Sequence, residues 1–418
     1  MTVNQRNFRP FLCSTILCLV IVRMASAQRE QALPFNFDDG SQPQGGLISD
    51  SNGNLYGTTY YGGSGPCTNN QGQVVGCGTI FEISPPVPPS TQWTETVLHS
   101  FNGDGVFPVG NLVMDPAGNL FAVTLQGGIG TGSVNELSPP SQPGGVWTET
   151  TICSFGQNCL GEYPQAGLVM DQTGNLYGTA LGNEFRAGLV YELTPTQNGA
   201  WQQTVLYNFS GGSTGSTPEC ELVLGSNGDL YGTTTAAGAN NVGVAFELSP
   251  PPSGETWTET VLHNFGQTTS DGSEPVAGLT FGPKGVPLGT TTHGGQFGGG
   301  TVFGLQPPPV PGGAWGYKVL YNFGAASTDG TTPYSTLLFY NGSVYGTTSI
   351  GGTSGAGTVF QMQQLSPGTL SETETYSFTG GRDGAVPMSG VTLKDYALYG
   401  TTTGGGFQNN GTAFRISH

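Results

Sequence analysis

The sequence predicts an all-β protein, a seven-bladed β-propeller with four strands in each blade. Three observations support this fold. The string Gly-Asn-Leu-Tyr-Gly-Thr-Thr at residues 53–59 returns, with small changes, in seven copies along the chain. Each copy lies in a unit of about 55 residues that holds four strand-like runs. Glycine and proline are abundant, and no unit has the apolar period of a helix. Repeated four-stranded units are typical of propellers.

The second unit shows the four expected strands in order, at residues 111–115, 120–124, 133–137 and 147–155. A Pro-Ala-Gly-Asn turn between the first two supplies residues that accept positive φ, as tight hairpins require. A proline-rich link leads to the fourth strand, and proline cannot join a ladder, so this link is a loop. Thr and Glu in the fourth run suit an outer strand.

The aromatic position of the string marks the repeat, and its occupants are Tyr56, Phe121, Tyr177, Tyr231, Leu288, Tyr345 and Tyr399. Apolar residues lie on both faces of the strands, as in Ile80-Phe81, which fits blades stacked face to face. A β-solenoid is the competing fold, but most solenoid rungs are shorter than these units.

The phase of the repeat predicts how the ring closes. The chain ends with a third-strand run at 411–416 and begins, at 33–37, with a run that resembles a fourth strand. We therefore expect the N-terminal strand to complete the last blade, because a blade without it would have a free edge.

Residues 1–27 have the layout of a secretory signal peptide, and residues 28–418 form the predicted propeller. Arg6 and Arg9 precede an apolar run at 11–22, and Ala25-Ser26-Ala27 is a small-residue cleavage site. The apolar run is too short to span a bilayer comfortably. A buried N-terminal element is the alternative. The expected location is extracellular or periplasmic, after cleavage near Ala27.

Beyond residue 27 the chain carries 7 basic and 27 acidic residues, a balance of −20. Such a surface repels phosphate backbones, so nucleic acid and anionic membranes are excluded as partners. Solubility outside the cell is a sufficient reason for the acidity.

Five cysteines lie beyond the signal, and in an exported chain close pairs predict disulfides. The expected bonds are Cys67–Cys77 and Cys153–Cys159. Cys220 is left over at the repeat position of Ala166, although a Cys159–Cys220 bond stays open. No CxxC is present and histidine is scarce, so no metal site or cofactor is expected.

The repeat resembles that of the GloVer tandem-repeat (choice-of-anchor) proteins of bacteria. The pattern of that family is a GNLYGTT string, a Gly-Gly pair and a GTVFEL string, seen here at 342–348, 351–352 and 357–361. The resemblance implies export. The family often carries a C-terminal sorting anchor, whereas this sequence stops at His418 inside the last blade, which favours free secretion. More loosely, the unit is similar to NHL-like and gluconolactonase-like propeller repeats, in which the strand before the turn is innermost.

The loop after the second strand varies most between units, and variable loops on a constant scaffold usually form the site of a propeller. Its residue types make Tyr60, Tyr61, Gln126 and His293 the candidate ligand contacts. The alternative is that they are exposed loop residues without a role. The longest insertion, around Cys67–Cys77, adjoins the two tyrosines and is the preferred patch.

Catalytic motifs are absent from the sequence: there is no GxSxG, HExxH or GxxxxGK[ST]. His293 is the one plausible general base. Recurrent Asp-Gly dipeptides fit turns better than calcium ligands, and Glu82, Glu136, Glu192 and Glu247 occupy a structural position in the third strand. The sequence predicts a non-enzymatic, monomeric binding or scaffold module with a carbohydrate or extracellular protein partner. An extracellular lyase or hydrolase and a structural cell-envelope component are the alternatives.

Overall fold

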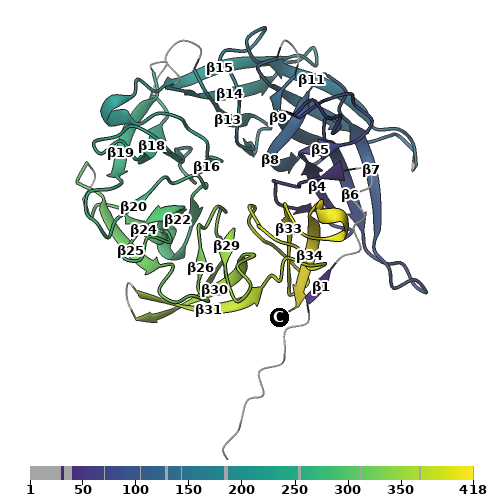
Figure 1. Cartoon of the computed structure of the whole chain (residues 1–418). Helices are drawn as coiled ribbons and strands as arrows, with labels where there is room; N and C mark the ends of the chain where they lie inside the picture. The colour runs from purple at the N-terminus through teal and green to yellow at the C-terminus, as the bar shows by residue number, and fades with distance from the viewer. Residues whose placement is uncertain are drawn as a thin grey trace, which may run out of the picture.

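The computed structural model is a closed ring of seven antiparallel sheets around a central axis (Figure 1). It describes residues 30–32, 40–69, 71–103, 105–127, 130–142, 144–182, 187–252, 256–310, 312–366 and 369–417. This arrangement confirms the predicted seven-bladed propeller. In blades 1 to 6 the strands follow chain order from the axis outward, so the strand before the turn is innermost, as the similarity to other propeller repeats implied; in blade 7 β32 is innermost and the N-terminal β1 is the outer strand.

The blades contain four strands each, with the following bounds. Blade 1 has β3 (Ile48–Ser49), β4 (Leu55–Thr59), β6 (Thr79–Ser84) and β7 (Thr94–Ser100), and blade 2 has β8 (Val106–Met114), β9 (Leu120–Gln126), β10 (Ser133–Ser138) and β11 (Thr148–Ser154). Blade 3 has β12 (Val169–Met170), β13 (Leu176–Ala180), β14 (Leu189–Pro195) and β15 (Trp201–Asn208), and blade 4 has β16 (Val223–Leu224), β17 (Leu230–Thr234), β18 (Val244–Ser249) and β19 (Thr258–Asn264). Blade 5 has β21 (Thr280–Phe281), β22 (Pro287–Thr291), β24 (Thr301–Gln306) and β25 (Gly316–Asn322), and blade 6 has β27 (Leu338–Tyr340), β28 (Ser343–Thr348), β30 (Thr358–Ser366) and β31 (Thr369–Ser377). Blade 7 has β32 (Thr392–Lys394), β33 (Ala397–Thr402), β34 (Thr412–Ser417) and β1 (Glu30–Ala32).

Short elements complete the chain. Three two-stranded pairs lie beside blades 1, 5 and 6, namely β2 (Gly40–Ser41) with β5 (Tyr61–Gly62), β20 (Gly272–Ser273) with β23 (His293–Gly294), and β26 (Gly330–Thr331) with β29 (Ile350–Gly351). Single 3-10 turns are η1 (Gly212–Thr214), η2 (Pro283–Gly285) and η3 (Phe407–Asn409).

The glycine of the repeated string makes room for an aromatic ring of the third strand. A Cβ on Gly57 would lie 2.6 Å from Cζ of Phe81, and one on Gly289 would lie 2.6 Å from Cζ of Phe303. Both phenylalanines are fully buried. The glycine is therefore repeated because any side chain there would displace the blade's largest core residue.

The two threonines of the string form hydrogen bonds in different directions. The first reaches the next blade: Thr347 Oγ1 donates to Ser389 O at 2.8 Å, and Thr401 Oγ1 donates to Gly45 O at 2.9 Å. The second stays within its own blade, as in the 2.8 Å contact between the hydroxyls of Thr348 and Thr358. The first threonine thus ties blades 3 to 7 to the next blade, whereas Thr58 of blade 1 has no such bond and blade 2 has Val123 at this position.

The N-terminal strand completes blade 7, which confirms the predicted closure. In β1, Glu30 pairs with Ile416 and Ala32 with Phe414, both on β34 (yellow in Figure 1). The paired residues come just before the run at 33–37 that we expected to form this strand, and that run lies outside the described residues. The first and last segments of the chain therefore share one sheet.

Both expected disulfides are formed, between Cys67 and Cys77 and between Cys153 and Cys159. Cys220 is a buried free thiol, so the alternative Cys159–Cys220 bond is wrong. Cys220 and Ala166 are buried at equivalent places in neighbouring blades, as the repeat predicted. The signal-peptide prediction falls on residues 1–27, outside the described residues. Within the described part of the chain, no helix is long and apolar enough to cross a membrane.

Candidate functional site

A second repeated string, Gly-x-x-Pro-x-x-x-Leu, builds one end of the ring. The residue before the proline adopts positive φ in all seven blades, although none of the seven is glycine; they are Gln42, Phe107, Tyr163, Thr217, Glu274, Thr332 and Val386. This conformation is uncommon for residues with a Cβ. Here it lets one residue bridge two blades: Glu274 N–H donates to Val242 O of blade 4, while Glu274 O accepts from Thr292 N of its own blade, both at 3.2 Å.

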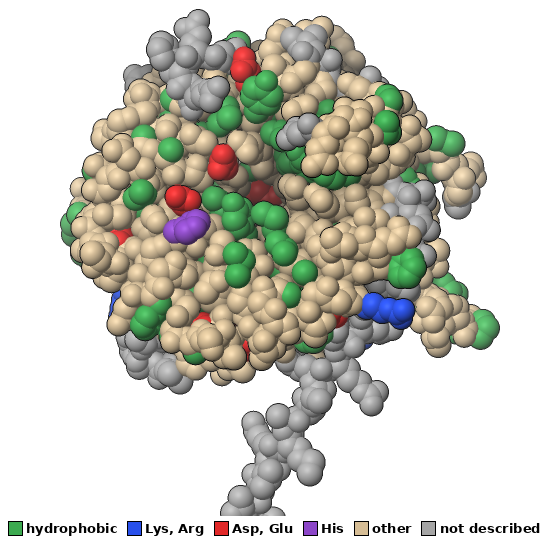
Figure 2. Space-filling view, in the orientation of Figure 1, with side chains coloured by type: hydrophobic (Ala, Val, Ile, Leu, Met, Phe, Trp, Pro, Cys, Tyr) green, Lys and Arg blue, Asp and Glu red, His purple; other side chains and the backbone are tan. Residues whose placement is uncertain are grey.

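The residues after the proline line a cavity of about 360 Å³ on the propeller axis. Every blade contributes one of them, and they are Gln44, Val109, Gln165, Glu219, Val276, Tyr334 and Met388. Figure 2 shows the hollow at this end, with acidic and hydrophobic side chains around it. The cavity is large enough for a small ligand, because ligand pockets begin at roughly 300 Å³.

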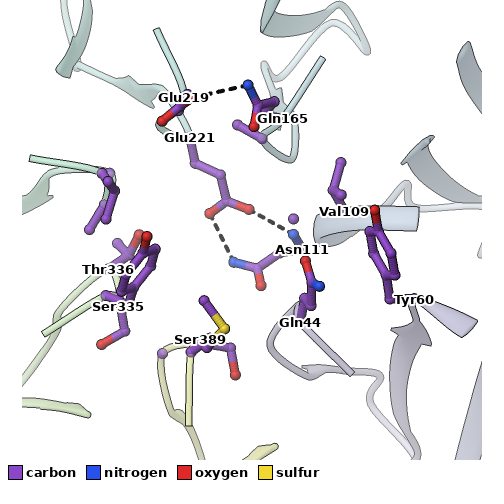
Figure 3. Close-up of a pocket in the computed structure, with 18 of the residues that line it drawn as sticks. Gln44, Tyr60, Val109, Asn111, Gln165, Glu219, Glu221, Ser335, Thr336 and Ser389 are labelled. Carbon is purple, nitrogen blue, oxygen red and sulfur yellow. Dashed lines mark hydrogen bonds between the residues drawn. The ribbon is translucent and has the colours of Figure 1, made fainter. Parts of the chain in front are cut away.

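The floor of the cavity is a hydrogen-bonded pair from blades 2 and 4, which lie on either side of blade 3. Glu221 Oε1 accepts from Asn111 N, and Glu221 Oε2 accepts from Asn111 Nδ2, both at 2.8 Å (Figure 3). Glycines make space for the pair, since a Cβ on Gly167 would lie 2.3 Å from Glu221 Oε1. Burial raises the pKa of Glu221, although the bonds from Asn111 oppose that rise.

An aromatic cluster contributes to one wall of the cavity through Tyr60, which is the ring of the cluster that lines it. Tyr60 stacks on Phe107 with ring centroids 5.0 Å apart, and Tyr61 packs edge-on against both rings. Phe107 is held by a bond from its N–H to Cys77 O at 2.8 Å, so the disulfide-pinned loop positions this wall. Burial raises the pKa of Tyr60, and Tyr61 adds to the rise.

The wall from blades 3 to 6 is polar and acidic. Gln165 Nε2 donates to Glu219 Oε1 at 3.0 Å (Figure 3). Burial raises the pKa of Glu219, and the nearby charge of Glu274 contributes. Tyr334 lines the same cavity, and burial raises its pKa, with the charges of Glu219 and Glu274 adding to the rise. At the rim, His293 Nδ1 lies 3.2 Å from Glu274 Oε2.

The four predicted contact residues lie at this end of the ring, and of these four Tyr60 alone lines the cavity. Tyr61 touches Tyr60. Gln126 ends β9 and His293 begins β23, at equivalent rim positions of blades 2 and 5, so the ring separates them. Both are exposed and outside the cavity lining. The preferred patch beside Cys67–Cys77 is thus joined to the axis through Phe107.

Sequence reasoning missed the innermost residues, above all Asn111, Glu219, Glu221 and Tyr334. Their signal was present in the positions between Pro and Leu of the second string, which change from blade to blade. Gly46, Gly167, Gly278 and Gly390 stand where Asn111, Glu221 and Thr336 stand in the other blades. Where most blades have glycine at this position and a few have a polar residue, the polar side chain lies near the propeller axis.

The third-strand glutamates and the Asp-Gly links, for which the sequence predicted a structural role, form hydrogen bonds that fit such a role. Glu192 accepts from Tyr177 Oη at 3.0 Å and Glu247 from Tyr231 Oη at 2.6 Å, each within its own blade. Asp271 and Asp329 of the Asp-Gly links accept backbone N–H groups, as turn residues do. Across the described residues, no group of three or more His, Cys, Asp or Glu side chains is arranged to hold a metal ion.

Known proteins share both the repeat and the fold. The sequence matches the Gloeobacter/Verrucomicrobia repeat over residues 20–246, 130–309 and 223–418. The chain belongs to this repeat family. No curated protein sequence matches it.

Among solved structures, this member of the repeat family is similar to an ulvan lyase from a new polysaccharide lyase family, bound to -[GlcA(1-4)Rha3S]-. The TM-score is 0.51 at 10% identity, over 90% of this chain and 89% of the lyase. A gluconolactonase from Xanthomonas campestris has a TM-score of 0.43 at 11% identity, over 93% and 89% of the two chains. The NanB sialidase from Streptococcus pneumoniae has a TM-score of 0.43 at 12% identity, over 93% and 70%. The likeness to the lyase supports the propeller fold and extends no further.

Proposed function

We propose that this protein is an exported binding module that takes a carbohydrate in the axial cavity. The observation that carries the proposal is that Tyr60, whose ring stacks on Phe107, and the hydrogen-bonded pair of Gln165 and Glu219 line the same cavity. Sugars have an apolar face and a polar edge. A pocket with few, convergent polar groups beside aromatic rings suits such a ligand.

The rigidity of the walls favours binding without a large entropic cost. Gln165 already fixes Glu219, and Asn111 fixes Glu221, before any ligand arrives. In each of the seven bridging turns, the N–H of the residue before the proline donates to a carbonyl of the preceding blade. Ordering few side chains on association preserves affinity.

Export follows from the signal-like residues 1–27, with residues 28–418 as the mature propeller, and two disulfides fit an oxidising compartment. Ring closure within one chain favours a monomer. The acidic surface disfavours nucleic acid and anionic membranes as partners.

The test is calorimetry of the purified protein against a panel of neutral, acidic and amine-bearing oligosaccharides. We expect binding by at least one class, and a loss of about ten-fold or more in affinity for Tyr60→Ala. The matched control is Tyr340→Ala, since Tyr340 is exposed on β27 and does not line the cavity. Binding of an extracellular protein and of no oligosaccharide would overturn the carbohydrate proposal.

A second candidate function, an extracellular hydrolase or lyase, rests on His293. Its Nδ1 lies 3.2 Å from Glu274 Oε2 and 3.0 Å from Thr292 Oγ1, so a carboxylate orients one nitrogen and leaves Nε2 for a proton. Turnover of any oligosaccharide that disappears in His293→Ala would establish this candidate. Binding without turnover by the unaltered protein excludes it for that ligand.

A further inference from the structure

We infer that the axial cavity selects sugars that carry protonated amines, such as glucosamine oligosaccharides, over neutral or N-acetylated sugars of the same length. The inference rests on the proposed carbohydrate binding and adds the class of ligand. Three features of the cavity support it: its charge, the neutral partners of its carboxylates, and its aromatic rings.

The charge of the cavity has one sign. Glu219 stands in the wall and Glu221 in the floor, while Glu274 lies outside the lining at the rim, with His293 Nδ1 3.2 Å from its Oε2. None of the described residues that line the cavity is Lys, Arg or His. Clefts lined by one sign of charge concentrate ligands of the opposite sign. An anionic sugar would meet repulsion from these carboxylates.

Neutral groups are the hydrogen-bond donors to the two lining carboxylates. Glu221 accepts from the backbone and side chain of Asn111, and Glu219 accepts from the amide of Gln165. Neutral donors satisfy oxygen lone pairs but leave the charge uncompensated. A partly buried charge without a counter-charge carries a desolvation cost, so a bound ammonium group would relieve a cost that a neutral hydroxyl would not.

Aromatic rings supply the remaining contacts. Tyr60 stands in one wall, and Tyr334 of blade 6 lines the same cavity as Glu219. An ammonium group between a carboxylate and a tyrosine face gains from both, and the ring of Tyr60 can take the apolar face of the sugar. A flexible polyamine carries the positive charge but has no apolar sugar face to stack on Tyr60. An amino sugar has both.

The experiment compares four ligands by calorimetry with the full mature chain: a glucosamine oligosaccharide, its N-acetylated counterpart, a cello-oligosaccharide of the same length, and spermidine. We expect the glucosamine oligosaccharide to bind about ten-fold more tightly than either neutral sugar, or about 1.4 kcal/mol. Added salt should erase most of that difference. Glu219→Gln should erase it too, while affinity for the cello-oligosaccharide is kept. Glu259→Gln, on the outer strand of the same blade, is the matched control.

The outcomes separate this inference from the proposed function. Equal affinity for the three sugars overturns the amine preference and leaves carbohydrate binding standing. No binding of any sugar overturns the proposed function. Spermidine that binds as tightly as the glucosamine oligosaccharide overturns the assignment to an amino sugar. If Glu219→Gln does not fold, the salt dependence of the unaltered protein decides, because a preference that persists in high salt contradicts a charge-based site.

Discussion

Glu221 reaches across the propeller axis to Asn111, which precedes it by 110 residues, and accepts both the backbone and the side-chain N–H of that residue at 2.8 Å. Blades 2 and 4 are thereby joined at the centre, past blade 3. Gly167 of blade 3 allows the crossing, because a Cβ there would lie 2.3 Å from Glu221 Oε1. The bond closes the floor of the cavity and ties together blades that are not neighbours.

Removing this carboxylate should destabilise the ring. In Glu221→Ala the two donors of Asn111 lose their acceptor, and an unsatisfied buried polar group costs about 1–3 kcal/mol. We expect the free energy of unfolding, measured by denaturant titration, to fall by that amount. Ser226→Ala in the exposed turn of the same blade is the control and should change little. An unchanged midpoint for Glu221→Ala would show that the crossing does not stabilise the ring.

The outer strands should make the protein less stable as pH rises. Burial raises the pKa of Glu259 and of Glu372 to about 7 from 4.5, although bonds from Tyr207 and Tyr321 oppose the rise. A folded pKa above the unfolded one gives stability that is complete below about pH 4.5 and is lost as pH rises through about 7. We therefore expect a higher melting temperature at about pH 5 than at about pH 8.

The double variant Glu259→Gln/Glu372→Gln provides the check by differential scanning calorimetry. Its melting temperature should fall less between the two pH values than that of the unaltered protein, because the amides do not titrate. Equal slopes in the two proteins would assign the pH dependence to other groups.

The fold could be predicted from the sequence because its repeated residues have packing roles that recur in every blade. Gly57 and its equivalents in most blades give space to rings such as Phe81, and Thr401 and its equivalents in blades 3 to 7 bond to the next blade. A position with the same neighbours in each blade keeps the same residue type. Repetition along the chain was therefore enough to count blades and to predict the closing strand.

Less of the candidate site could be predicted from the sequence, because its central contacts depend on the three-dimensional ring. Tyr60 was found because the loop insertion draws attention to it. The contact between Asn111 and Glu221 depends on the diameter of the ring and on the glycines beside it, neither of which is a spacing along the chain. The signal was the set of positions in the Gly-x-x-Pro-x-x-x-Leu string at which Asn111 and Glu221 replace the glycine of other blades. These positions belong to a different string from the loops that we favoured.

The closing strand should be a large contributor to stability. A chain that begins at residue 39 lacks β1, so β34 of blade 7 becomes a free edge. We expect it to lose more than about 2 kcal/mol in free energy of unfolding relative to a chain that begins at residue 28. Denaturant titration of both proteins measures the difference. Identical midpoints would contradict a stabilising role for the N-terminal segment.

The two disulfides should differ in their effect on ligand binding. Cys67–Cys77 belongs to the loop whose Cys77 O accepts the Phe107 N–H, and Phe107 stacks on Tyr60 in the cavity wall. Replacing both cysteines by serine should cost about 2–3 kcal/mol of stability, from the freedom regained by a short loop in the unfolded chain. It should also weaken oligosaccharide binding several-fold, because the aromatic wall loses its support.

The double serine variant of Cys153 and Cys159 is the matched control, because it removes a disulfide that joins β11 to the loop after it. It should lose stability and keep its affinity, as measured by calorimetry on folded protein below the melting temperature. Equal losses of affinity in the two variants would mean that the ring as a whole, and not the support of Phe107 by the Cys67–Cys77 loop, sets the geometry of the cavity.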